Sequence, residues 1–136
     1  MIAAVCTWHE HFSRASGELD RRLNAGELLV AAAPALVETY SVLTRLPTPR
    51  RLSPGAARTL LQSNFMRDST NLVTLDANDY RRLIDSAPAR GIAGGRIYVA
   101  VILACAVSAR VDVLLTFNAR DFASLSLPGI EIVVPG

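Results

Sequence analysis

Two polar side chains, Asn118 and Asp121, follow directly after an apolar run and are the clearest candidates for chemistry in this chain. The run is Val111–Phe117, VDVLLTF, and it predicts a buried parallel strand. In an open α/β sheet, ligands bind just beyond the carboxyl ends of the strands. We therefore expect Asn118 and Asp121 to lie in a ligand-binding crevice.

The residues ahead of this strand predict a helix that lies inside the protein. Ile97–Val107 is apolar at nearly every position, and a helix that is apolar all round is normally buried. It is too short for a membrane span, which needs about 20 such residues. Gly94 and Gly95 favour close packing at its start, and Ser108–Arg110 turns the chain into the strand. We expect the first turn of the helix, Arg96–Val99, to face the same crevice.

Length and composition indicate one ordered domain. The chain has 136 residues, of which 51% are hydrophobic, enough for a core and too many for a disordered protein. The net charge is only +2, and all the basic residues are arginines. Arginine binds phosphate well, but a bias in genomic base composition also favours it, and the scattered positions favour that second interpretation.

Cysteine usage and the N-terminal residues predict a reduced, cytoplasmic protein without a membrane span. Cys6 and Cys105 have no metal-site spacing, and Cys105 falls in the buried helix as a small core residue. The first residues, MIAAVCTWHEHF, lack the basic segment of a signal peptide. His9 and His11 are two apart, so on a helix they would point to different faces, and we expect no metal site there.

Strands alternating with helices predict an α/β fold with a parallel sheet covered by helices on both faces. The start, MIAAV, fits either a strand stub or the beginning of the first helix. Periodicity, caps and turn residues predict the following elements: helix Thr7–Leu23, strand Glu27–Ala32, helix Pro34–Leu46, helix Pro54–Phe65 capped by Ser53, strand Asn71–Leu75, a helix capped by Asp76 with Asp79 at N3 and an inner face of Tyr80, Leu83, Ile84 and Ala87, turn Leu127–Gly129 and strand Ile130–Val134.

Several segments, in this order, resemble the VapC-type PIN-domain proteins: TWHEHFSRA, GELLVAAAPALVETYSVLTRLP, RLSP, GIAGGRIY and DVLLTFNARDF. The resemblance covers nearly the whole chain and implies a single PIN-like domain over residues 1–136. It implies a three-layer α/β fold with a parallel sheet. It also implies a toxin of a toxin–antitoxin pair that cuts RNA with Mg²⁺ or Mn²⁺, dimerises and binds a VapB-like antitoxin. Hard divalent cations prefer the clustered carboxylates of such a site.

Position by position, the resemblance implies a depleted metal site. The family's first acid ends an initial strand, and this chain starts after it, so that strand is expected to be missing or truncated. The second acid falls on Glu38, and the third falls on Val99, where the carboxylate is lost. The fourth position falls on Asn118, with Asp121 close behind. Two arginines beside these positions, Arg96 and Arg120, are then the expected RNA contacts.

Each candidate also has a purely structural interpretation. Glu38 is alternatively a solvated residue that gains from the dipole at the start of its helix, and Val99 is alternatively a core residue. Asn118 is alternatively the cap of a short helix, Ala119–Ala123. Asp121 is alternatively the surface partner of Arg120 or Arg96.

Three functional classes remain open on the sequence alone. The first is a metal-dependent endoribonuclease, the second a PIN fold that binds an antitoxin or RNA without catalysis, and the third an unrelated α/β ligand-binding domain. One Glu and one nearby Asp bind Mg²⁺ poorly. We therefore expect weak RNA cleavage or none.

Self-association is the last expectation. Several apolar residues exceed what helices on one sheet need to bury, and some should be left for a partner. These residues are Trp8, Phe12, Leu60, Leu61 and Phe65.

Overall fold

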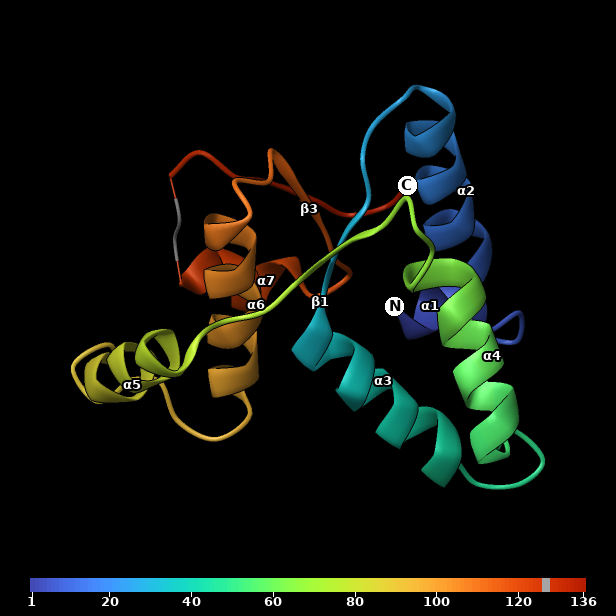
Figure 1. Ribbon diagram of the computed structural model, residues 1–136, viewed down its shortest axis with the longest axis horizontal. Coiled ribbons are helices and arrows are strands. Elements are labelled where there is room, and N and C mark those ends of the chain that lie inside the picture. The colour runs from blue at the N-terminus through green and yellow to red at the C-terminus, as the bar shows by residue number, and fades with distance from the viewer. Residues whose placement is uncertain (126–127) are drawn as a thin grey trace. The chain divides into compact units, whose positions relative to one another are not determined.

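The computed structural model describes residues 1–125 and 128–136 (Figure 1). Leu127, part of a predicted turn, lies outside the described residues. The chain divides into two compact units, one of residues 1–72 with residue 136 and one of residues 73–135. The prediction of a single domain stays a prediction. The elements are α1 (Ile2–Val5), α2 (Phe12–Asn24), β1 (Val30–Ala32), α3 (Ala33–Arg45), α4 (Pro54–Phe65), β2 (Asn71–Val73), α5 (Ala77–Ser86), α6 (Arg96–Ser108), β3 (Val113–Leu115), α7 (Ala119–Ser124) and β4 (Glu131–Val133).

The predicted alternation of helices and strands is confirmed, and the fold is α/β. Hydrogen bonds join the strands two by two, β1 with β2 and β3 with β4. β3 and β4 are parallel, as predicted, with Leu114 opposite Ile132. Every strand is shorter than the apolar run that predicts it, because only part of each run forms backbone hydrogen bonds with a neighbouring strand.

The first unit is built on a hairpin of α3 and α4, with α1 packed on α2. Its core combines residues from α3, α4, β1 and the turn after α1. The buried members are Cys6, Ala31, Leu36, Leu43, Ala57, Leu61 and Phe65. Leu61 and Phe65, two of the five apolar residues of which some were expected to remain for a partner, fill this core, whereas Trp8 stays 39% exposed. Leu60 also packs against this core.

The chain start forms a separate short helix, α1, rather than a strand stub. The predicted helix over Thr7–Leu23 begins only at Phe12. The reason is local: the backbone N–H of His11 donates to Nδ1 of His9 at 3.1 Å, which holds a turn between the two helices. α2 then ends at Asn24, one residue after the predicted Leu23, and Gly26 follows with φ of +87°, where glycine is favoured.

Capping signals predicted the starts of α4 and α5 correctly. Ser53 Oγ accepts the N–H of Ala56 at 3.2 Å and begins α4. Asp76 and Asp79 form a full capping box at α5, in which the N–H of Asp79 donates to Asp76 Oδ1 at 2.8 Å. The predicted inner face of α5 is only half right: Leu83 and Ala87 are buried, whereas Tyr80 is 37% and Ile84 59% exposed.

The apolar helix α6 supplies much of the buried surface of the second unit. Its buried residues are Ala100, Val101, Leu103, Cys105 and Ala106. It is not buried all round, since Tyr98 and Val107 are exposed. The helix ends as the N–H of Val111 donates to the carbonyl of Ala106 at 3.1 Å, with Arg110 at a φ of +52° in the position that glycine usually takes. No helix in the described part of the chain is long and apolar enough to span a membrane.

Candidate functional site

The carboxyl end of β3 leads directly into α7. The backbone N–H of Thr116 donates to the carbonyl of Val133 at 3.0 Å, which extends the pairing with β4 by one residue. Thr116 Oγ1 then accepts the N–H of Asn118 at 3.0 Å and turns the chain out of the sheet. This turn places Asn118 and Asp121 at the carboxyl end of β3, where ligands bind in open α/β sheets.

Asn118 and Asp121 contact each other. Asn118 Nδ2 donates to Asp121 Oδ2 at 2.7 Å. Asn118 occupies the N-cap position of α7, as the structural interpretation predicted, but its side chain makes no capping hydrogen bond. Nδ2 is a donor, and the charged carboxylate is a strong acceptor for it. The amide orients the carboxylate while both groups remain accessible.

A hydrogen-bonded chain ties the first residue of α6 to α7. Arg96 Nη2 donates to Ser124 Oγ at 2.9 Å, and Ser124 Oγ donates to the carbonyl of Asp121 at 2.7 Å. α6 also packs against α7. The first turn of α6 and the Asn118–Asp121 pair therefore belong to one local structure. Sequence reasoning missed Ser124, because a serine in the last turn of a short helix carries no distinctive signal.

Asp121 makes no ion pair with either arginine that was expected to hold it. Within the described residues, the carboxylate of Asp121 accepts a hydrogen bond from Asn118, and the guanidinium of Arg96 donates to Ser124. Arg120 is exposed and makes no hydrogen bond or ion pair there. This arginine is free to meet a ligand from solvent.

Val99 is the fourth residue of α6 and is partly buried. The first turn of α6 has no acidic residue and begins with Arg96. A helix N-terminus carries partial positive charge, so this end of the helix is positive with no carboxylate to offset it. Such a helix start favours an anion over a cation.

Glu38 lies in the first unit, on α3, and is exposed. It is the sixth residue of the helix, and the first turn of α3 contains no acid. The interpretation that Glu38 gains from the start of the helix dipole is therefore wrong. Its charge acts instead on the α-amino group of Met1: burial lowers the pKa of that group, and the charges of Cys6 and Glu38 partly raise it.

The two cysteines are buried and unpaired, and neither is a candidate nucleophile. Burial raises the pKa of the Cys6 thiol, and the charge of the Met1 amino group lowers it in part. Burial and the charge of Asp79 raise the pKa of the Cys105 thiol. Both thiols are held in the protonated, unreactive form at neutral pH.

The donor set does not fit a divalent metal ion of the family type. The strand end offers the carboxylate of Asp121 and the amide of Asn118, and the first turn of α6 has no acidic residue. Among residues 1–125 and 128–136, no group of three or more His, Cys, Asp or Glu side chains could hold a metal. Mg²⁺ sheds its water reluctantly and needs carboxylates to replace it. The roles of Glu38, Asn118 and Asp121 as ligands stay predictions.

Comparisons with known proteins find a family model and two kinds of relative that match most of the chain. Residues 1–126 match the PIN domain family. Ribonuclease VapC40 of Mycobacterium tuberculosis, in strains CDC 1551 / Oshkosh and ATCC 25618 / H37Rv, is 41% identical over 102 residues, 75% of this chain and 69% of the relative. Ribonuclease VapC27 of strain H37Rv is 35% identical over 100 residues, 74% of this chain and 69% of the relative. No solved structure matches the chain significantly.

Proposed function

The chain belongs to the PIN-domain family, in its VapC type, and from this premise we propose that it is a toxin ribonuclease whose own metal-dependent cleavage is weak. The observation that carries the proposal is the 41% identity to ribonuclease VapC40 over three quarters of the chain. Its partners are RNA as substrate, a VapB-like antitoxin and a second copy of the chain. The cytoplasmic location stays a prediction.

The proposal that metal-dependent RNA cleavage is weak rests on the first turn of α6. Val99 stands at a position where the family pattern has Asp, and an isopropyl group coordinates no metal. The partial positive charge of the helix start and the guanidinium of Arg96 then act against a cation. Loss of metal charge from the transition state costs several kcal/mol, or roughly a thousandfold in rate.

A second function, a PIN fold that binds RNA or an antitoxin without cutting, is favoured by one observation. The strand end has few carboxylates, but it carries the exposed Arg120, which makes no hydrogen bond or ion pair among the described residues, and α7 also holds Arg96 through Ser124. Guanidinium groups bind phosphate with two parallel hydrogen bonds and need no metal. In this alternative the same end of the sheet holds the RNA backbone and leaves it intact.

A fluorogenic RNA assay with Mg²⁺ and with Mn²⁺ tests the proposal. We expect weak cleavage by the unmodified chain, lost in Glu38→Ala, and an increase of roughly a hundredfold or more in Val99→Asp. Val107→Asp is the matched control, because it places the same group on an exposed position near the other end of α6. RNA affinity, measured by fluorescence anisotropy, should fall in Arg120→Ala whether or not cleavage occurs.

Three outcomes separate the alternatives. Strong metal-dependent cleavage by the unmodified chain, abolished in Glu38→Ala, would show that the site functions despite Val99. Binding of RNA without cleavage by any variant would favour the binding module. Neither cleavage nor RNA binding would contradict both functions.

A further inference from the structure

Trp8 and Arg50 form an exposed pair of side chains in the first unit. The guanidinium carbon of Arg50 lies 4.7 Å from the centre of the Trp8 ring. This contact is a cation–π interaction, for which tryptophan is the best aromatic partner. Trp8 is 39% exposed with Arg50 in place. The pair therefore presents a planar cation and a large aromatic ring to solvent side by side.

The core of the first unit holds these two side chains together. Cys6, two positions before Trp8, is a buried member of that core, and Leu52, two positions after Arg50, packs against it. The backbone N–H of Leu52 donates to the carbonyl of Leu43 at 3.0 Å, which fixes the loop after α3 to that helix. The pair is thus formed before any ligand arrives, and a ligand does not bear the cost of ordering it.

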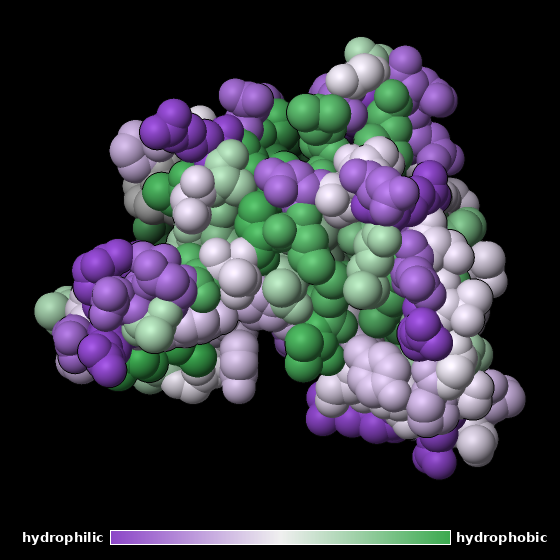
Figure 2. Space-filling model, viewed as in Figure 1, coloured by the Kyte–Doolittle hydropathy of each residue, from purple (hydrophilic) through white to green (hydrophobic). Residues whose placement is uncertain are grey.

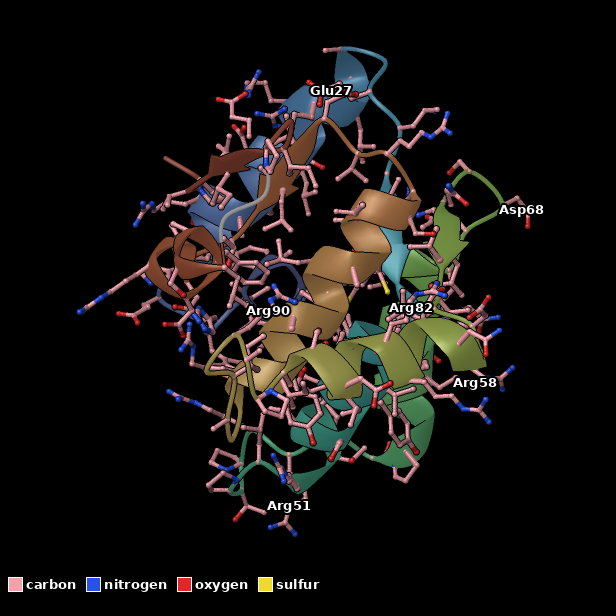
Figure 3. All side chains as sticks on the ribbon, turned by 90° about the vertical axis from the view of Figure 1, so that its left-hand side faces the viewer. Glu27, Arg51, Arg58, Asp68, Arg82 and Arg90 are labelled. Carbon is pink, nitrogen blue, oxygen red and sulfur yellow. The ribbon has the colours of Figure 1, made fainter. Side chains whose placement is uncertain are left out.

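The hydrogen-bond donors of the pair have no partner. Among residues 1–125 and 128–136, neither the guanidinium of Arg50 nor the indole N–H of Trp8 makes a hydrogen bond or an ion pair. The end of α3 and the loop after it add the exposed Arg45 and Arg51, with no acid between them. Arg51 lies at the outer edge of this loop (Figure 3), and the surface at the end of α3 includes strongly hydrophilic patches (Figure 2).

We propose that the Trp8–Arg50 pair binds an unpaired nucleotide of single-stranded RNA, whose base stacks on the pair while its phosphate accepts hydrogen bonds from Arg50. Unpaired bases stack on aromatic rings and on arginine planes in proteins that bind single-stranded RNA. The guanidinium also offers a fork of N–H groups that matches a phosphate. An acidic peptide would meet the charge of Arg50 but would gain nothing from the aromatic ring.

The same geometry selects against double-stranded RNA. In a duplex the faces of the bases are covered by neighbouring bases, so only the phosphate contact remains. This inference rests on the RNA partner of the proposed function and adds a contact in the first unit, whereas Asn118 and Asp121 belong to the second. The pair would therefore favour RNA segments that are not base-paired.

Trp8 is the only tryptophan of the chain, so the intrinsic tryptophan fluorescence reports directly on this surface. The titration uses the full chain in EDTA, which prevents metal-dependent cleavage, and a single-stranded RNA of about twelve uridines. We expect saturable quenching of the fluorescence as bases stack on the pair. A duplex RNA of the same length and an oligoglutamate peptide are the comparison ligands, and each should bind roughly tenfold more weakly or worse.

Substitutions test which property of the pair binds RNA, with affinity measured by the anisotropy of a labelled single strand. Arg50→Ala and Trp8→Ala should each weaken binding roughly tenfold. Arg50→Lys keeps the charge but loses the planar group, and it should weaken binding about threefold or more. Arg58→Ala is the matched control and should stay within about twofold, because Arg58 is an exposed arginine on α4 that projects into solvent in Figure 3.

Circular dichroism checks that each variant is folded, and the Arg50 variants change only an exposed side chain. RNA binding without quenching of Trp8 would overturn the proposal, as would an unchanged affinity in Arg50→Lys. Equal affinity for the duplex or for oligoglutamate would also overturn it, and so would a chain that binds no RNA. None of these measurements involves cleavage, so the rise in cleavage expected for Val99→Asp tests the ribonuclease proposal separately.

Discussion

Replacing Val99 with Asp should create metal binding at the end of β3, measurable without any RNA. The hydrogen bonds from Arg96 to Ser124 and from Ser124 to Asp121 hold the first turn of α6 beside α7. A carboxylate at position 99 would therefore join that of Asp121 and the amide of Asn118 as a third oxygen donor. Each additional carboxylate raises the affinity for Mg²⁺ or Mn²⁺, because it replaces water in the coordination sphere.

The magnitude follows from ligand linkage. A metal ion that binds only the folded state and is present at ten times its dissociation constant stabilises that state by about 1.4 kcal/mol. For a domain of this size, that raises the melting temperature by about 5 °C. The substitution itself should be nearly neutral: the partly exposed Val99 loses about 1 kcal/mol of apolar burial, and an acid near the helix start regains about 0.3–1 kcal/mol.

Thermal denaturation with and without 10 mM Mg²⁺ or 1 mM Mn²⁺, on the order of typical assay concentrations, is the measurement. We expect a metal-dependent shift in Val99→Asp, little shift in the unmodified chain, and loss of the shift in Val99→Asp/Asp121→Ala. Val107→Asp again serves as the matched control. An equal shift in the unmodified chain, or in the control, would refute the reasoning that Val99 is the missing ligand.

Two further predictions concern stability. The hydrogen bonds from Arg21 and Arg22 lower the pKa of Glu18 to about 2, so its ion pairs stabilise the fold above the ordinary Glu pKa and this contribution is lost as pH falls toward 2. In urea unfolding at pH 6, Glu18→Gln should therefore have a lower free energy of unfolding than the unmodified chain. This difference should narrow as the pH falls from about 4.5, the ordinary pKa of Glu, to about 2, its pKa in the folded chain. A difference in free energy that stays constant over this range would contradict the assignment. Asp76→Ala removes the capping box of α5 and should cost about 1 kcal/mol, or about 4 °C in melting temperature, whereas no change would show that α5 does not need its cap.

Local signals in the sequence were sufficient for the positions of most helices. Ser53 before Pro54 and the Asp76–Asp79 pair each specify a helix start through hydrogen bonds within a few residues. The left-handed backbone at Gly26 specifies a helix end in the same way. These interactions form without help from distant parts of the chain, so residue type and spacing predict them.

Side-chain hydrogen bonds and packing that periodicity does not encode could not be predicted. The start of the first helix was misplaced because the ring of His9 accepts a backbone N–H, an interaction that no periodicity encodes. The sequence left open which of five apolar residues would stay uncovered, and the α3–α4 hairpin buries Leu61 and Phe65. Tyr80 and Ile84 were assigned to the inner face of α5, but the stripe is wider than the fold covers.

For the candidate site, the sequence by itself determined which chemical groups are available. It identified Asn118 and Asp121 at the end of a parallel strand, an apolar Val99 at the start of the buried helix, and the resemblance that gives these positions meaning. A strand end and a helix start are set by short-range patterns, so the types of donor at each can be read directly.

Only the tertiary structure decided what those groups do to one another. The β3–α7 turn sets the hydrogen bond from Asn118 to Asp121, and the packing of α6 on α7 makes Arg96 bond to Ser124 instead of pairing with Asp121. Each polar group chooses among several partners that lie within reach, and the choice depends on which elements pack together. Hydrogen-bond geometry is sensitive to a few tenths of an ångström, a precision that the packing of α6 against α7 supplies and residue spacing does not.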